Sequence, residues 1–218
     1  MVDYKSARHN MVESQLRTNK VRSEPILAAF ETVPRELFLP ENRRGIAYVD
    51  EDIALGHGRF MIEPMVLARL LQAARPGPAD MALEVGCGSG YATAILAHIV
   101  ATVVAVESVG NLSEMAAEAL ASLNHDNAVV MKGEIVEGWP GQAPYDVILI
   151  NGAVSEVPQA ICDQLAEGGR LVAVVRPDRG MGRAMLFERH AGVVSSRALF
   201  DAAVPLLPEF EAAPSFVF

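Results

Sequence analysis

Three glycines on alternate positions, Gly86, Gly88 and Gly90, interrupt a strongly apolar part of the chain. A short apolar run over 81–85 precedes them, and a helical pattern over about 90–99 follows. A strand, a glycine turn and a helix in this order form a nucleotide-binding corner, because glycine adopts positive φ and lets a ligand approach the backbone closely. The sequence therefore predicts an α/β fold with a cofactor site at this corner.

The spacing of the turn separates two classes of cofactor. The dinucleotide fingerprint places its third glycine three residues after the second, whereas here the interval is two. An acid, Glu84, also lies two residues before Gly86. This pattern resembles motif I of class I S-adenosylmethionine-dependent methyltransferases, in which the turn lies against the methionine part of the cofactor. The resemblance implies that the cofactor lies against the residues Glu84, Gly86, Cys87, Gly88, Ser89 and Gly90.

Strands and helices are expected to alternate after residue 78. We expect strands over 81–85, 102–106, 128–131, 145–150 and 170–175, with helices over 90–99, 112–123 and 158–167. Gly168-Gly169 is expected to end the last helix, and 184–189 with 193–200 to form an edge hairpin. This alternation predicts a Rossmann-like fold, with a mostly parallel central sheet and helices on both faces.

A single domain of 218 residues is expected, in three parts. Residues 1–78 form an extension with helices over 1–22, 23–33 and 65–74 and a loop over 56–64. Residues 79–200 form the cofactor-binding core. Residues 201–218 form a tail, for which we favour a strap along one edge of the domain over a docking segment.

Composition limits the partners of the chain. A net charge of −9 without a basic run argues against nucleic acid, and no apolar run is long enough to span a membrane. Two cysteines, Cys87 and Cys162, form neither a metal-binding spacing nor a disulfide framework, which favours the cytoplasm. No metal site is expected, and the oligomeric state stays open.

Polar residues follow several of the expected strands. Glu107, with Ser108 after it, ends the second strand, where a carboxylate can accept both hydroxyls of a cofactor ribose; the alternative is a solvated acid. Glu134 and Ile135 follow the third strand, where many methyltransferases place an acid on the adenine amino group; the alternative for Glu134 is an ordinary loop acid. Asn151 ends the fourth, and it either faces the cofactor or simply terminates the strand.

Two further residues are weighed as reactive groups. His57 lies between two glycines, as an active-site loop histidine or, more simply, a turn residue. Cys87 fits a small filler better than a nucleophile, since no neighbour is placed to activate it.

The segments around the turn resemble the protein-L-isoaspartate (D-aspartate) O-methyltransferase family. The resemblance is carried by the segments Val33-Pro-Arg-Glu-Leu-Phe38, Ala47-Tyr-Val-Asp50, Gly56-His-Gly58 with Pro64, Leu83 to Tyr91, Ala143-Pro-Tyr-Asp146 and Gln164 to Val172. It implies S-adenosylmethionine as cofactor, S-adenosylhomocysteine as product, and a peptide or protein carboxylate as acceptor in the repair of isoaspartyl residues.

Residues 56–64 correspond to the family's substrate loop, and we call them the substrate loop; they depart from the family pattern. The family's glutamine, threonine and active-site serine positions hold Arg59, Phe60 and Ile62. The hydroxyl is lost at Ile62, whereas Arg59 and His57 could contact an anionic acceptor. We therefore expect an altered acceptor site. The alternatives are a cofactor-binding member that acts through a partner without catalysis, and, with less support, a nicotinamide-dependent dehydrogenase.

Overall fold

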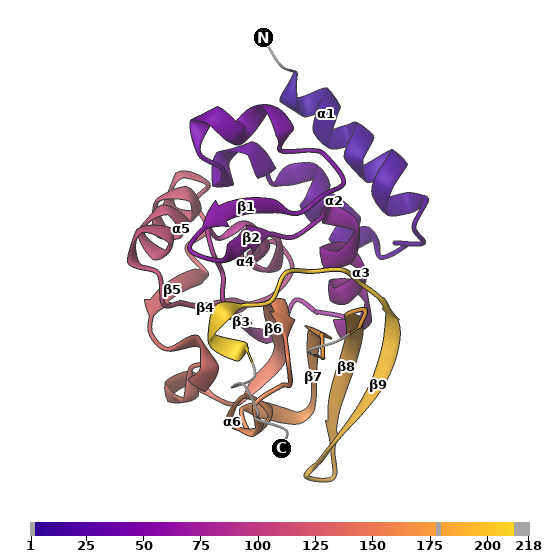
Figure 1. Cartoon of the computed structure of the whole chain (residues 1–218), viewed down its shortest axis with the longest axis vertical. Coiled ribbons are helices and arrows are strands. Elements are labelled where there is room, and N and C mark those ends of the chain that lie inside the picture. The colour runs from indigo at the N-terminus through magenta and orange to yellow at the C-terminus, as the bar shows by residue number, and fades with distance from the viewer. Residues whose placement is uncertain (1–2, 178–179, 212–218) are drawn as a thin grey trace, which may run out of the picture.

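A seven-stranded sheet lies at the centre of the computed structural model, which describes residues 3–177 and 180–211 (Figure 1). The strands follow the order β5-β4-β3-β6-β7-β8-β9. They are β3 (Met81–Val85), β4 (Thr102–Glu107), β5 (Ala128–Lys132), β6 (Tyr145–Val154), β7 (Leu165–Val175), β8 (Arg183–His190) and β9 (Val193–Asp201). Strands β3 to β7 are parallel, and β8 is antiparallel to both its neighbours. The predicted α/β class, the mostly parallel sheet and the edge hairpin are confirmed.

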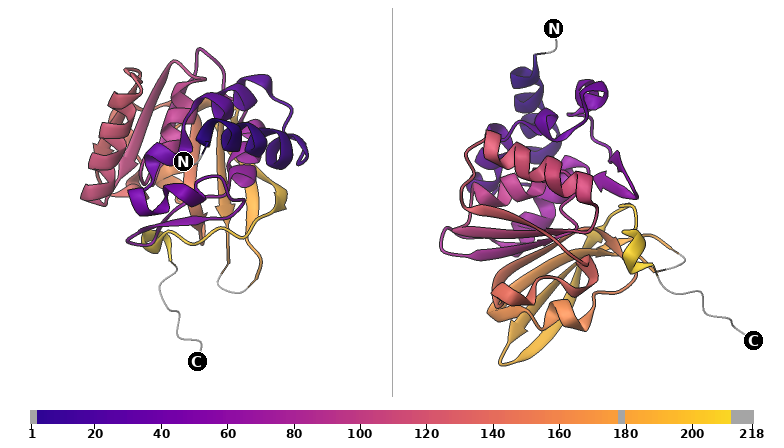
Figure 2. Two further views of the ribbon diagram at one scale, coloured as in Figure 1. Left: turned by 90° about the horizontal axis from the view of Figure 1, so that it is seen from above. Right: turned by 90° about the vertical axis from the view of Figure 1, so that its left-hand side faces the viewer.

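Most of the helices cover one face of this sheet. They are α1 (Tyr4–Met11), α2 (Glu24–Thr32), α3 (Pro64–Ala74), α4 (Tyr91–Ala97), α5 (Gly110–Ser122) and α6 (Gln159–Cys162), and a π-helical segment, η1 (Val12–Arg17), extends α1. Five 3-10 turns complete the set: η2 (Arg35–Phe38), η3 (Glu41–Ile46), η4 (Ile135–Glu137), η5 (Pro140–Gln142) and η6 (Pro208–Phe210). Helices α4 and α5 lie on one side of the sheet and α6 on the other (Figure 2). None of the helices within 3–177 and 180–211 has the length and apolar character needed to cross a membrane.

Alternate residues of the central strands pack into two hydrophobic cores, one on each face of the sheet. On β3, Ala82 joins a cluster that includes residues from Met11 to Val204, whereas Leu83 joins a cluster on the opposite face. This alternation follows from the two-residue period of a strand, and both faces are apolar because both are covered. The N-terminal helices therefore share a core with the α/β part of the chain.

Two segments differ from the sequence-based expectations. The helix predicted over 158–167 is wrong beyond Cys162, because Leu165 already pairs with Tyr145 at the start of β7. Gly168 and Gly169 lie inside an irregular part of that strand rather than at a helix end. The expected loop over 56–64 includes part of a hairpin, in which β1 (Ile53–Gly56) pairs with β2 (Arg59–Met61).

After β9 the chain crosses the carboxyl edge of the parallel strands, and we call residues 202–210 the C-terminal strap (Figure 1). The Ala153 N–H of β6 donates to the Pro205 carbonyl, and the Leu207 N–H donates back to the Ala153 carbonyl, both at 2.9 Å. The described part of the tail therefore lies against the sheet as a strap. The choice between a strap and a docking segment stays a prediction for the tail as a whole, since residues 212–218 lie outside the described residues.

Candidate functional site

The glycine turn lies between β3 and α4 at the carboxyl edge of the sheet. Gly86, Gly88 and Gly90 have φ values of 74°, 55° and 89°, which side chains with a Cβ rarely adopt. The Gly86 N–H donates to the Val106 carbonyl at 2.9 Å, which fixes the turn against the end of β4. A Cβ on Gly90 would lie 2.9 Å from the Ala116 side chain, so close packing of α5 also requires this glycine.

Glu107 ends β4 directly beside this turn and is fully buried. Its carboxylate accepts hydrogen bonds from three backbone N–H groups, those of Gly88 (2.8 Å), Ser108 (2.9 Å) and Val109 (3.0 Å). These donors hold a buried negative charge at the carboxyl edge of the sheet. The acid therefore lies at the position that its sequence offset from Gly86 predicts.

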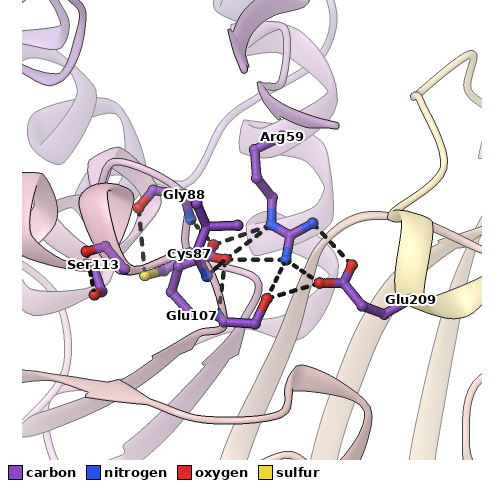
Figure 3. A network of polar contacts seen from close by, with 9 residues as sticks. Arg59, Cys87, Gly88, Glu107, Ser113 and Glu209 are labelled. Atoms are coloured by element: carbon purple, nitrogen blue, oxygen red, sulfur yellow. Dashed lines mark hydrogen bonds and ion pairs between the residues drawn. The ribbon is translucent and has the colours of Figure 1, made fainter. Parts of the chain in front are cut away.

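Arg59 of β2 lies against Glu107 and shields it from solvent (Figure 3). Its side chain is 1% exposed, and its Nε donates to both Glu107 carboxylate oxygens at 3.1 and 3.2 Å. The guanidinium also binds Glu209 of the strap through two nitrogens, at 2.7 and 2.9 Å. Removing one member of a buried ion pair typically costs roughly 3–5 kcal/mol, because the other charge stays buried and unpaired.

Glu209 and Ser108 complete this network. The Ser108 hydroxyl donates to Glu209 at 2.7 Å and accepts from Arg59 at 2.9 Å. Burial opposes the charge of Glu209, but the hydrogen bonds from Arg59 and Ser108 lower its pKa to about 2. Burial also opposes the charge of Arg59, but its bonds to Glu209 and Glu107 hold the pKa of Arg59 above its usual value. Arg59 and Glu209 are therefore both charged at neutral pH.

Side chains of the strap and of β1 lie over the glycine turn. A Cβ built on Gly86 would lie 3.3 Å from the Leu207 side chain, and one on Gly152 would lie 2.6 Å from it. A Cβ on Gly88 would lie 2.9 Å from the Leu55 side chain. The space above the turn is therefore filled by Leu55 and Leu207.

A second polar group lies beneath the turn. The Thr93 hydroxyl and the Asn151 amide donate to the two oxygens of Glu84, at 2.6 and 2.8 Å. Burial raises the pKa of Glu84 to about 8, although both hydrogen bonds act to lower it. Glu84 is therefore protonated at neutral pH, and it fixes the orientation of Asn151.

A cavity of about 10 Å³, large enough for one water molecule, lies beside this group. The residues that line it include Phe60, Ile62, Ser89, Tyr91 and Asn151. The Oδ1 atom of Asn151 and the hydroxyl of Tyr91 are buried, and neither has a hydrogen-bond partner among the described residues. Two polar atoms therefore remain available where the substrate loop meets the turn.

The remaining predicted residues lie around these groups. Ile62 is buried, and its carbonyl accepts from the Arg35 guanidinium at 2.9 Å. His57 is exposed in the β1–β2 turn with a φ of 52°, as both interpretations of this residue require. Glu134 is exposed, whereas Ile135 is buried and would lie 3.7 Å from a Cβ on Gly86.

Cys87 is buried inside the turn, and burial raises the pKa of its thiol well above the usual value. A thiol in this state is a poor nucleophile, which agrees with its interpretation as a small filler. Within 3–177 and 180–211, no three His, Cys, Asp or Glu side chains gather in a way that could hold a metal ion.

Sequence reasoning missed the residues that the strap and β1 bring to the site, namely Leu55, Leu207 and Glu209. Glu209 lies 102 positions after Glu107, and no periodic pattern links the two. The one available signal was an isolated acid in an otherwise apolar, proline-containing stretch over 202–210.

Comparisons with known proteins all match one family. The family model described as protein-L-isoaspartate(D-aspartate) O-methyltransferase matches residues 6–207. Protein-L-isoaspartate O-methyltransferase 1 of Rhodopseudomonas palustris is 40% identical over 186 residues, which is 85% of this chain and 76% of the relative. Protein-L-isoaspartate O-methyltransferase of Methanoculleus marisnigri is 36% identical, over 93% of this chain and 92% of the relative.

Solved structures show the same architecture. A protein-L-isoaspartate O-methyltransferase structure superposes with a TM-score of 0.81 at 25% identity, over 92% of this chain and 65% of that structure. A crystal structure from Plasmodium falciparum, of a putative protein-L-isoaspartate O-methyltransferase in complex with S-adenosyl-L-homocysteine, gives a TM-score of 0.79 at 22% identity. It aligns with 96% of this chain over its full length.

Proposed function

This chain belongs to the protein-L-isoaspartate (D-aspartate) O-methyltransferase family, and from that premise we propose that it transfers a methyl group from S-adenosylmethionine to a peptide or protein carboxylate. Glu107 carries the proposal, since its buried carboxylate lies beside the glycine turn at the position of a ribose-binding acid. Family membership favours this cofactor over the nicotinamide alternative.

The donor set suits S-adenosylmethionine. Glu107 can accept the two ribose hydroxyls, and the turn at Gly86 and Gly88 offers backbone without a Cβ to the methionine part. Glu134 and Ile135 after β5 are proposed for the adenine ring, and Asn151, with its unpartnered Oδ1, for the amino end of the cofactor. The Plasmodium relative, solved with S-adenosyl-L-homocysteine, supports this assignment. In the conformation described here, however, Arg59 and Leu207 fill the same space.

Bound S-adenosylmethionine supplies an electrophilic methyl group. A carboxylate acceptor is already ionised at neutral pH, so the protein needs no base to activate it. The task of the chain is to orient the acceptor and to exclude water, which can account for a large part of the barrier reduction. Phe60, Ile62 and Leu67 form an apolar wall beside Asn151 and Ser89, which limits the access of water to this place.

Methyl transfer from labelled S-adenosylmethionine tests the proposal directly. An isoaspartyl peptide is compared with the same peptide containing ordinary aspartate, and label is expected in the isoaspartyl peptide alone. Glu107→Ala is the matched negative variant, because it removes the proposed ribose contact. Failure of wild-type protein to label any peptide or protein carboxylate would contradict the proposal.

Ile62 is the residue expected to limit turnover of isoaspartyl peptides. Ile62→Ser restores a hydroxyl at the family's serine position, and Ile62→Ala removes a similar volume without adding a donor. A hydrogen bond to a charged group is worth roughly 1.5–3 kcal/mol, so we expect Ser to exceed Ala in kcat/KM by about ten- to a hundredfold. Equal rates for the two variants would show that the missing hydroxyl is not the cause.

The absence of a hydroxyl at Ile62 also supports a second candidate, a family member that binds the cofactor without transferring its methyl group. Micromolar binding of S-adenosylhomocysteine with no labelling of peptides or of a cell extract would support it. Detected transfer to any acceptor would remove it. The cytoplasmic location inferred from cysteine usage stays a prediction, and fractionation of cells that express the protein would test it.

A further inference from the structure

We propose that Arg59 and the C-terminal strap occupy the cofactor site in the free protein, as an internal competitor that must leave before S-adenosylmethionine binds. This inference rests on the proposed function. The contact joins Arg59 of β2 with the strap, residues 202–210. The two lie far apart in the sequence but meet over the glycine turn (Figures 1 and 3).

Ribose hydroxyls cannot reach the carboxylate of Glu107 while Arg59 is in place. The carboxylate is fully buried, and the guanidinium lies within 3.0–3.2 Å of both its oxygens. Three backbone N–H groups also donate to these oxygens. Since the backbone donors are fixed by the turn and by the end of β4, Arg59 is the group that has to withdraw.

The strap closes the space above the turn independently of this charge network. The Leu207 side chain is 2% exposed and lies against both Gly86 and Gly152. A cavity beside the turn, lined by residues that include Leu55, Ser89 and Asn151, measures about 10 Å³, whereas ligand pockets usually measure about 300–1,000 Å³. A nucleoside-sized ligand cannot occupy the space directly above Gly86 while the Leu207 side chain lies there.

The strap is held at several points. Its backbone exchanges one pair of hydrogen bonds with Ala153, the Ala202 N–H donates to the Gly182 carbonyl at 2.9 Å, and the Phe210 carbonyl accepts from the N–H and the hydroxyl of Ser155. Glu209 adds its bonds to Arg59 and Ser108, and four buried residues add apolar surface, namely Ala202, Val204, Leu207 and Phe210. Of these contacts, those of Glu209 and Leu207 lie over the glycine turn, so they are the ones that must break when the cofactor binds.

Arg59 couples the two obstructions because its Nε and Nη2 bind Glu107 while its Nη1 and Nη2 bind Glu209. Release of the strap removes one of its two counter-ions, and withdrawal of Arg59 removes the main polar anchor of the strap. Cofactor affinity is then the intrinsic affinity multiplied by the fraction of molecules in the undocked state, so a tenfold preference for docking lowers it about tenfold.

Calorimetric titration with S-adenosylhomocysteine tests the competition. Glu209→Gln weakens the ion pair, and Leu207→Ala empties the space above Gly86; both are expected to lower the Kd by about five- to twentyfold. Glu188→Gln is the matched control, since it removes the same charge from an ion pair with Arg75 that is partly exposed. Glu188 pairs with Arg170 toward the start of β7, away from the carboxyl edge where the glycine turn lies. The Kd of this control is expected to equal that of the wild type.

Hydrogen exchange gives a readout that does not depend on activity. In the free protein, both variants are expected to speed exchange over residues 202–210 but not at Ile148 in β6. Saturating S-adenosylhomocysteine is expected to speed exchange over 202–210 of the wild type. Unchanged or weaker binding by both variants, or slower strap exchange with ligand, would overturn the inference while leaving the proposed function intact. No binding by wild type or variants would overturn both.

Discussion

Glu84 shows how a single buried acid can make the stability of the molecule depend on pH. Burial, partly offset by hydrogen bonds from Thr93 and Asn151, raises its pKa from 4.5 to about 8. The native state therefore keeps a proton between pH 4.5 and 8 that the unfolded chain has released. Because the unfolded state then binds fewer protons, the free energy of unfolding falls as pH rises through this range and levels off above it.

Glu84→Gln is expected to remove this dependence, because glutamine is uncharged at every pH. The free energy of unfolding of the variant relative to wild type should rise between pH 5 and 8 by on the order of a few kcal/mol. Urea denaturation at several pH values measures it. Glu134→Gln removes an exposed acid and serves as the control, with no such trend expected. A constant difference for Glu84→Gln would show that Glu84 is ionised in the native protein.

The irregular start of β7 is an element whose form depends on glycine: Gly168 has a φ of 76°, and Gly169 packs against backbone. A Cβ on Gly169 would lie 2.8 Å from the Ala166 carbonyl oxygen and 3.0 Å from that of Tyr145. Both are backbone atoms, so the side chain cannot be accommodated without shifting the pairing of β6 with β7.

Gly169→Ala is therefore expected to lower the free energy of unfolding by about 2–3 kcal/mol. Gly45→Ala is the matched control, because a Cβ there meets nothing within 4 Å. That control should stay within about 0.5 kcal/mol of wild type or stabilise it slightly. Thermal denaturation of the two variants compares them directly, and an equal loss in both would contradict the argument from β7.

At the scale of the whole molecule, one hydrophobic cluster joins the N-terminal helices, one face of the sheet and the edge hairpin. Leu16 of η1 and Leu186 of β8 are both fully buried in it. The cluster predicts that these parts unfold together rather than as separate units.

Leu16→Ala tests this, with an expected loss of about 2–5 kcal/mol in the free energy of unfolding. Trp139 is the single tryptophan and packs against the cluster on the opposite face. Its fluorescence and the far-ultraviolet circular dichroism should follow one coincident transition in urea, shifted equally by the substitution. Leu37→Ala, at a position that is 38% exposed, should cost less. Separate transitions for the two signals would contradict a shared core.

The sequence predicted the parts of the structure that depend on local patterns. Apolar runs of four to six residues located the parallel strands, and the offset of Glu107 from Gly86 placed this acid beside the turn. The helix expected over 158–167 ended early because a long-range pairing, Leu165 with Tyr145, competes with local helical spacing. The same limit applies to Arg59: its side chain points at Glu107 only because the β1–β2 hairpin folds over the turn.

The antiparallel pairing of β8 with β7 and β9 determines the edge at which the chain leaves the sheet. Because β8 is antiparallel to both β7 and β9, β9 again runs in the direction of the parallel strands, and the chain leaves it at their carboxyl edge. Glu211 follows the strap directly and is exposed, two residues after Glu209. A fluorescent label attached at this position is therefore expected to respond to events at the glycine turn.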